Sequence, residues 1–331
     1  MKFNYSKICA DLISDLKERE KEVISRRFAL TAEAFSEGGD GRETLESIGQ
    51  SFGICRERVR QIQKVALGKI KPKLSQYQKV FQYFKEYLKS SGDLKKEDIL
   101  LEALAGKNQK PQVYFLLTLD DSFERFGETD DFYSFWLIDR DSLKQAKETL
   151  EFLFQKLQKL GKPLTLKEVG SFLSLKEKVL TSYLEISKKI QKVDEHSFIS
   201  TLRSARVNRE GLYGLKDWPE INPRGIKDKA YLVFKKIGKP LHFTEVAKLI
   251  EGSHLQTVHN ELIKDKRFVL VGRGTYALAD WGYFPGQVKD VILKILEEEG
   301  KPLSKEEILE KVLEQRIVKE NTVLLNLSNK K

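Results

Sequence analysis

The stretch GICRERVRQIQ, residues 53–63, carries three arginines, a glutamate and two glutamines within about three turns of a predicted helix. These residue types form directional hydrogen bonds with DNA base edges: arginine pairs with guanine, glutamate accepts from the cytosine amino group, and glutamine pairs with adenine. Glutamate repels phosphate, so a glutamate in a DNA-facing cluster is expected only where it forms a hydrogen bond with a base. The alternative interpretation is a charged surface helix that faces only solvent.

The residues before this stretch predict a second helix that crosses the first. Apolar and small residues recur through TLESIGQSFGICRERVRQIQ, residues 44–63, with a glycine at the bend, which is the spacing of a helix-turn-helix. Gly53 allows the positive φ of a tight turn, and small Gly49 allows the two helices to approach closely. Thr44 and Cys55 fall at the two N-cap positions, where threonine is favoured and cysteine is poor.

The period of the second helix separates a buried face from an outward one. Val59 and Ile62 must face the core, and the 3.6-residue repeat then fixes the opposite face. Arg58 lies off that face and is assigned to phosphates or to a local ion pair. The side chains predicted to point outward together, and to read bases, are Arg56, Glu57, Arg60, Gln61 and Lys64.

Composition points to an anionic partner. The chain has 331 residues and a net charge of +10, which favours nucleic acid over a membrane surface. The charge is uneven, because residues 76–150 hold 11 basic and 14 acidic side chains while both flanks are basic. This acidic segment is expected to bind protein rather than duplex DNA.

Several classes of protein are excluded by what the sequence lacks. There is no apolar run of the roughly 18 residues needed to span a membrane, and no signal peptide, so a cytoplasmic, nucleoid-associated protein is expected. Two cysteines and four histidines show no metal-ligand spacing, so neither a metal nor another cofactor is expected. No nucleophile–base pair or phosphate-binding loop indicates an enzyme.

Two longer stretches carry a family resemblance. LKEREKEVISRRFAL, residues 16–30, and ETLESIGQSFGICRERVRQIQKVALGKIK, residues 43–71, resemble region 4 of sigma-70-type initiation factors. The resemblance covers about residues 10–73. It implies a domain that binds an upstream promoter element and the RNA polymerase flap, with Arg56, Glu57, Arg60 and Gln61 reading bases. It also implies that four apolar residues line the side of the domain near the polymerase, namely Leu16, Val23, Ile24 and Phe28. The alternative is that these four residues form the core of the domain itself.

Two features depart from that family. The glycine-rich SEGGDG, residues 36–41, makes the connection between the two stretches longer than the pattern requires. No aromatic-rich segment resembles the region 2 that melts promoter DNA, which argues against a self-sufficient initiation factor.

A repeat fills much of the remaining chain. GKPL occurs at Gly161, Gly238 and Gly300, and each copy carries a glutamate seven residues after its glycine. An amphipathic helix precedes each copy; glycine ends that helix and proline prevents its continuation. Further helices follow, and after the middle copy two short β-type runs joined by GRG predict a hairpin. Three helices and a hairpin make a winged helix.

The predicted fold is therefore mainly α: a helix-turn-helix domain followed by tandem winged-helix modules. The segment DEHSFISTLRSARVNRE, residues 194–210, is interpreted as an enlarged wing, and the middle copy resembles the HARE-HTH domain of the RNA polymerase delta subunit. The predicted divisions are a sigma-like domain at 1–75, a divergent acidic winged-helix-like module at 76–140, winged-helix modules at 141–222 and 223–284, and a partial module without a wing at 285–331.

Two hypotheses for function follow. The first is a bacterial-type transcription factor that recognises double-stranded promoter DNA and contacts RNA polymerase; the second is a protein-interaction scaffold in which only the N-terminal domain binds DNA. The oligomeric state, the promoter sequence, and activation or repression stay open. In the first hypothesis the middle winged helix would contact DNA through residues at or near its recognition helix and wing, namely His254, Gln256, Thr257, His259, Lys264, Lys266, Arg267 and Arg273.

Overall fold

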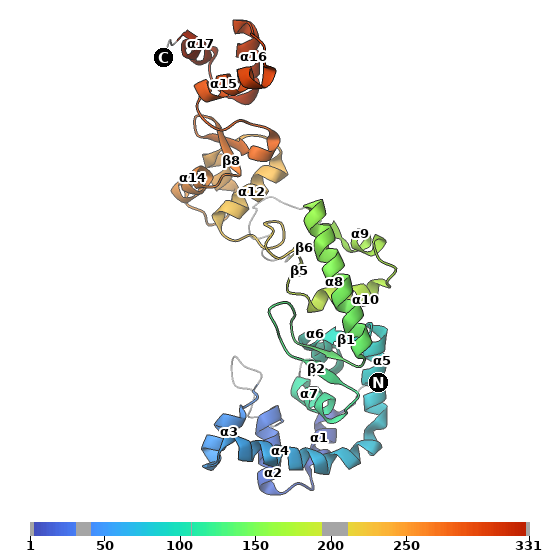
Figure 1. Ribbon diagram of the computed structural model, residues 1–331. Coiled ribbons are helices and arrows are strands. Elements are labelled where there is room, and N and C mark those ends of the chain that lie inside the picture. Colours follow the sequence, from blue (N-terminus) through green and yellow to red (C-terminus); the bar gives the residue numbers. More distant parts are fainter. Residues whose placement is uncertain (1–2, 31–40, 107, 194–210, 329–331) are drawn as a thin grey trace. The chain divides into compact units, whose positions relative to one another are not determined.

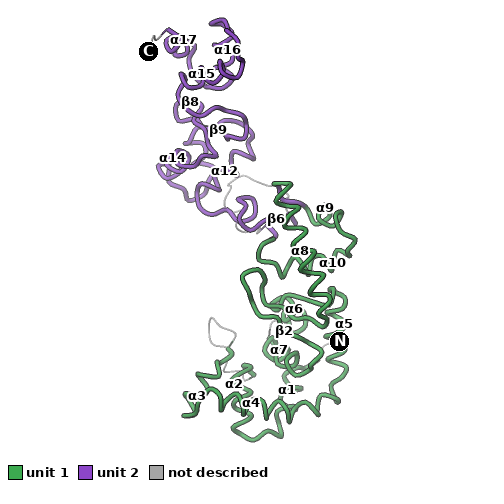
Figure 2. Tube along the Cα trace, viewed as in Figure 1, with its two compact units in different colours: residues 1–161, 165–191 green, residues 162–164, 192–331 purple. Residues whose placement is uncertain are grey.

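The computed structural model describes residues 3–30, 41–106, 108–193 and 211–328 (Figure 1). The chain divides into two compact units, residues 1–161 with 165–191 and residues 162–164 with 192–331 (Figure 2). It is mainly helical, and small three-stranded sheets follow the helical segments, which confirms the predicted fold class. The predicted enlarged wing at 194–210, and all of the glycine-rich stretch except Gly41, lie outside the described residues.

The first unit begins with four helices and continues through two modules. Its elements are α1 (Tyr5–Ile13), α2 (Glu18–Phe28), α3 (Leu45–Phe52), α4 (Arg56–Ile70), the 3-10 helix η2 (Lys71–Tyr77), α5 (Gln78–Ser90), β1 (Leu94–Lys96), α6 (Glu97–Ala105), α7 (Lys110–Leu119), β2 (Glu124–Phe126), β3 (Phe135–Leu137), α8 (Arg140–Leu160), α9 (Leu166–Ser171) and α10 (Glu177–Ile186). The short strands β4 (Leu164–Thr165) and β5 (Ile190–Lys192) lie at the division between the units.

The predicted helix-turn-helix is formed by α3 and α4. The Thr44 side chain accepts from the Ser47 backbone N–H at the start of α3, and Gly53 ends α3 with φ of +64°. Cys55 precedes α4 without a side-chain cap, as expected for a poor capping residue. A small core of Val23, Ile48 and Val59 holds α2, α3 and α4 together.

Gly49 is the point of closest approach between α3 and the turn. A Cβ built on this residue would lie 2.7 Å from the Ile54 carbonyl oxygen and 3.5 Å from the Arg56 backbone nitrogen. Because those atoms belong to the backbone, a larger side chain cannot be accommodated by a change of rotamer. The sequence prediction of a close approach at Gly49 is confirmed, although the nearest atoms belong to the turn and to the first residue of α4.

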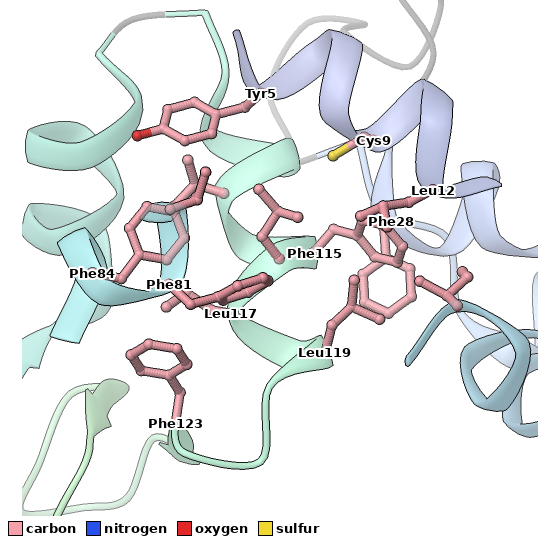
Figure 3. Packing of buried hydrophobic residues seen from close by; sticks show 14 of the residues in the cluster. Tyr5, Cys9, Leu12, Phe28, Phe81, Phe84, Phe115, Leu117, Leu119 and Phe123 are labelled. Atoms are coloured by element: carbon pink, nitrogen blue, oxygen red, sulfur yellow. The ribbon is translucent and has the colours of Figure 1, made fainter. Parts of the chain in front are cut away.

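A larger core joins the N-terminal helices to the second module (Figure 3). Tyr5, Cys9 and Leu12 of α1 pack with aromatic and aliphatic side chains of α5 and α7. The rings of Phe28, at the end of α2, and Phe115, in α7, have centroids 4.9 Å apart. The apolar cluster thus extends across residue 75, which the sequence analysis gave as a domain boundary.

The second module has the predicted order of helices and strands. Its sheet has the strand order β1-β3-β2, with Leu94 opposite Leu137 and Phe126 opposite Phe135. Trp136 of β3 is 1% exposed, and its indole N–H donates to the Glu97 carboxylate. This aromatic hairpin therefore packs inward rather than presenting its tryptophan to solvent.

The third module packs on the second through α10. Lys95 of β1 is buried and pairs with Glu185 of α10 at 2.7 Å. Lys188 and Lys189, just after α10, pair with Glu128 and Asp131 in the loop before β3. These acidic side chains of the second module thus have partners within the chain.

The second unit contains the middle winged helix. Its elements are β6 (Leu212–Leu215), α12 (Ile226–Ile237), β7 (Leu241–His242), α13 (Phe243–Leu249), α14 (Leu255–Lys264), β8 (Phe268–Gly272), β9 (Thr275–Leu278), the 3-10 helix η3 (Ala279–Trp281), α15 (Val288–Glu299), α16 (Lys305–Gln315) and α17 (Glu320–Ser328). The sheet order β7-β9-β8 contains the predicted hairpin, which turns at Arg273 and Gly274.

The GKPL repeat is a helix stop followed by a helix start. Gly161, Gly238 and Gly300 are left-handed C-caps with φ of +64°, +71° and +61°. The shared glutamates complete capping boxes three residues after each N-cap, in the pairs Thr165–Glu168, His242–Glu245 and Ser304–Glu307. The repeated glutamate therefore has a structural explanation.

The last module attaches to the wing of the middle one. The Ile317 backbone N–H donates to the Val271 carbonyl at 2.7 Å, and buried Arg316 donates to the Phe284 and Gly286 carbonyls. After α16 the described residues continue only as α17, with no further strand up to Ser328. The assignment of these residues to a partial module without a wing stays a prediction.

We expect Phe28→Ala to destabilise α2 and α7 together, because Phe28 belongs to the core that both helices share. Removing a buried phenylalanine costs about 3–5 kcal/mol in free energy of unfolding. Amide hydrogen exchange under native conditions measures this, and both helices should lose protection in parallel. The control is Phe152→Ala, because Phe152 is 45% exposed on α8. Unchanged protection of α7 in Phe28→Ala would mean that the two parts fold separately.

We expect Gly49→Ala to destabilise the helix-turn-helix by about 1–3 kcal/mol, because its Cβ must displace backbone. The matched control is Gly68→Ala in α4, where an added Cβ has nothing within 4 Å. Alanine is a better helix former than glycine, so the control should stabilise by up to about 1 kcal/mol. Urea unfolding of the two variants should give opposite signs; equal signs would refute the close-approach explanation.

Candidate nucleic-acid interface

The outward face of α4 is the cationic surface that the sequence predicts. Val59 is fully buried and Ile62 is half-buried, so these two residues fix which side of α4 faces the core. Between Arg56 and Ile70 the helix carries five basic side chains and one acidic one. The predicted base-reading residues are all exposed: Arg56, Glu57, Arg60, Gln61 and Lys64, together with Arg58.

Four of these side chains bond to one another. Arg60 donates to both carboxylate oxygens of Glu57, from Nε at 2.8 Å and from Nη2 at 2.7 Å. Arg58 donates to the Gln61 side-chain oxygen at 3.1 Å, and a phosphate contact by Arg58 stays a prediction. The three-residue spacing of both pairs along a helix is the signal that could have predicted them.

The Glu57–Arg60 pair keeps the glutamate ionised. Hydrogen bonds from Arg60 lower the pKa of Glu57, and the same bonds raise the pKa of Arg60. Both side chains are more than half exposed. An exposed ion pair of this kind contributes little net free energy in water, so it can open when a better partner is present.

A buttress that the sequence analysis missed fixes α3 against α2. Arg26 of α2 donates to both carboxylate oxygens of Glu43 at 2.7 Å and, through Nη1, to Ser51 at 2.8 Å. Its guanidinium and that of Arg19 also lie over the Phe52 ring, 5.6 and 5.2 Å from the centroid. Arg26 also lowers the pKa of Glu43. Arg26 and Glu43 are 17 positions apart, so no short-range sequence pattern predicts their pairing.

The residues assigned to the polymerase side are buried. Val23 lies in the small core of the helix-turn-helix, while Leu16, Ile24 and Phe28 lie in the core shared with the second module. Each is at most 8% exposed. Their burial supports the alternative interpretation, in which these side chains pack in the core of the protein. A polymerase contact by these four side chains stays a prediction.

The residues assigned to DNA contacts in the middle winged helix are not equivalent. Gln256, Thr257, Lys264, Lys266 and Arg273 are exposed, as is His254 at the N-cap of α14. His259 is half-buried, and its ring stacks on Phe243 with centroids 4.2 Å apart. This stacking gives His259 a packing role.

Arg267 is held by two carboxylates. It bonds to Asp265 and, at 2.8 Å, to Asp228 of α12, and these bonds raise its pKa. Its guanidinium also lies 4.8 Å from the centroid of the Tyr231 ring. Arg267 therefore ties β8 to the first helix of its module, and its DNA contact stays a prediction.

Neither a metal site nor a membrane-spanning helix is found among the described residues. Among the residues that the structure describes, no three histidine, cysteine, aspartate or glutamate side chains are placed to hold a metal ion. Within the same residues, no helix is both long and apolar enough to cross a bilayer.

Comparison with known proteins identifies the N-terminal part of the chain. Residues 12–71 match the family model "Sigma-70, region 4". A similar protein is the RNA polymerase sigma factor SigA from Bacillus sp., which is 44% identical over 62 residues. The match spans 18% of this chain and 14% of that relative, so it concerns one domain of each. The helix-turn-helix built by α2, α3 and α4 is therefore a sigma-70 region 4 domain.

Proposed function

We propose that this protein binds double-stranded promoter DNA through α4 and contacts RNA polymerase to regulate the initiation of transcription. The observation that carries the proposal is the exposed outward face of α4 on a region 4 domain, with three basic side chains and one acidic one, Arg56, Arg60, Lys64 and Glu57. The proposal places the protein in the cytoplasm, with the chromosome. It involves no cofactor and no catalytic step.

The exposed side chains divide the work between affinity and sequence preference. Arg56 and Lys64 form no hydrogen bond or ion pair with any residue that the structure describes, so their charge is available to phosphates. Phosphate contacts by lysine and arginine supply affinity and make it dependent on salt. Base-edge contacts by Glu57, Arg60 and Gln61 would supply the preference for sequence.

The Glu57–Arg60 pair controls what Arg60 can contact. Its Nε and Nη2 groups already donate to Glu57, so a bidentate contact with guanine requires the pair to open or the guanidinium to turn. On random duplex the pair stays closed, and Glu57 opposes nearby phosphates. On a preferred duplex, hydrogen bonds from a cytosine amino group to Glu57 and from Arg60 to a guanine would replace the bonds lost when the Glu57–Arg60 pair opens.

We expect Glu57→Ala to relax sequence preference more than it weakens binding, because it removes a phosphate-repelling charge together with a base contact. Arg60→Ala should weaken binding to the preferred duplex by about 10- to 100-fold, the range for a lost bidentate base contact. Fluorescence anisotropy on a duplex selected from a random library, and on an unselected pool, measures both effects.

The matched control is Arg140→Ala, because Arg140 forms the same kind of exposed two-bond pair with Glu124, far from α4 in sequence. It should alter neither affinity nor preference. Equal losses on both duplexes for Glu57→Ala and Arg60→Ala would leave α4 a phosphate-binding helix without base reading.

We expect the full chain to bind RNA polymerase without a DNA bridge. In size-exclusion chromatography with bacterial RNA polymerase core, it should co-elute after nuclease treatment, and the Arg60→Ala variant should co-elute equally. Co-elution that disappears with nuclease, or with Arg60→Ala, would show that DNA joins the two proteins and would remove the polymerase contact from the proposal.

A second candidate function is a protein-interaction scaffold in which residues 12–71 alone bind DNA. It is supported by the packing of the modules, because α7 and α10, the third helices of their modules, are used for contacts within the chain. The acidic side chains Glu128 and Asp131 are likewise paired with Lys188 and Lys189. The two candidates agree on α4 and differ only in what the modules contact.

A further inference from the structure

The third helix of the middle winged helix has an apolar outer surface. Leu255 and Ile263 of α14 are 48% and 61% exposed, and Leu270 of β8 is 49% exposed. Leu270 alternates with Val269 and Val271, so it shares the sheet face of Phe268, which packs with Val258 and Leu262 of α14. We name Leu255, Ile263 and Leu270 the α14 surface.

This surface differs in chemistry from the outward face of α4. Over its length α14 carries one acidic and one basic side chain, whereas α4 carries five basic and one acidic. Leucine and isoleucine offer base edges only a contact with the thymine methyl group and offer phosphates nothing. The exposed side chains of α14 combine these two apolar residues with Gln256, Thr257, Asn260 and Lys264, and the apolar ones add little to the binding of a duplex.

The corresponding helices of the two preceding modules show how such a surface is used. In the second module, Phe115 and Leu119 of α7 pack with Leu12 of α1 and Phe28 of α2 (Figure 3). In the third module, α10 packs on β1 through Glu185, which pairs with Lys95, and through Val179, which lies against Gly92. In both, the third helix binds protein, and in the first case the partner includes an amphipathic helix.

The rim of the α14 surface is basic. Lys264 ends α14, Lys266 precedes β8 and Arg273 lies in the turn of the hairpin, and all three are exposed. None of them forms an ion pair within the described part of the chain. Apolar side chains bordered by available cations match a partner whose apolar stripe is bordered by carboxylates.

We propose that the α14 surface is a docking site for an amphipathic helix of a partner protein, with carboxylates flanking its apolar stripe. Leu255 and Ile263 lie eight positions apart, about 12 Å or two turns along α14, which suits apolar anchors two turns apart on a docked helix. The proposal rests on the second candidate function, protein binding by the modules, and does not depend on promoter recognition by α4.

The test uses the full chain and a labelled synthetic helix with leucines at positions i, i+3, i+4 and i+7 and glutamates on both flanks. We expect saturable binding in fluorescence anisotropy, and loss of binding for the same peptide with lysines in place of the glutamates. Ile263→Glu and, independently, Leu255→Glu should each weaken binding by at least about 10-fold, as for a central apolar anchor.

The matched control is Leu293→Glu, since Leu293 is 58% exposed on α15, in the last module. It should change peptide affinity by less than about 2-fold, and thermal unfolding should show all three variants to be folded. Duplex affinity, measured in parallel, should be the same in all of them. The duplex measurement reports on DNA binding by α4, whereas the peptide measurement reports on the α14 surface. Failure of promoter binding and failure of docking therefore give different results.

Four results would overturn the proposal. These are no saturable binding of the acidic peptide, equal binding of the acidic and basic peptides, equal effects of Ile263→Glu and Leu293→Glu, and loss of duplex affinity specific to Ile263→Glu, which would make α14 a DNA-binding helix. Sedimentation adds a fifth: a dimer abolished by Ile263→Glu would identify a second copy of this chain as the occupant.

Discussion

The burial of short helices that are apolar on more than one side is the constraint on which the first unit depends. In α7, Phe115 and Leu116 are both fully buried although they are neighbours in sequence, and neighbours project about 100° apart around a helix. One module cannot cover both directions. Packing by α1 and by Phe28 of α2 covers the second direction, so the region 4 domain and the acidic module share apolar cover.

The same constraint explains why α4 is free to face outward. Its core contacts are few: Val59 in the small helix-turn-helix core, and Ala66 and Ile70 in the larger one. The position of α3 is set by that small core together with polar bonds from Arg26 to Glu43 and Ser51. A helix held along one narrow side can present arginines, lysine and glutamate to solvent without burying any of them.

Charge is used in two different ways along the chain. On α4 the basic side chains exceed the acidic ones, and Arg56 and Lys64 form no hydrogen bond or ion pair with the described residues, which suits a polyanion. In the second module Glu128 is exposed and Asp131 is half-buried, yet they pair with Lys188 and Lys189 of the next module. Ion pairs across a module boundary thus offset part of the acidic charge of this segment, and its binding of a protein partner stays a prediction.

The sequence by itself determined the local elements: the turn at Gly53, the N-cap at Thr44, the helix stops of the GKPL repeat and the outward face of α4. Each depends on backbone conformation or helical period within a few residues, which residue type controls directly. The order of three helices followed by a hairpin in the second module also follows from the sequence pattern. Only the tertiary structure decided which apolar faces are covered, that Arg267 is held by Asp228, and that Arg26 buttresses α3. These contacts join residues far apart in the chain, and their formation depends on how whole helices pack, which no short-range pattern encodes.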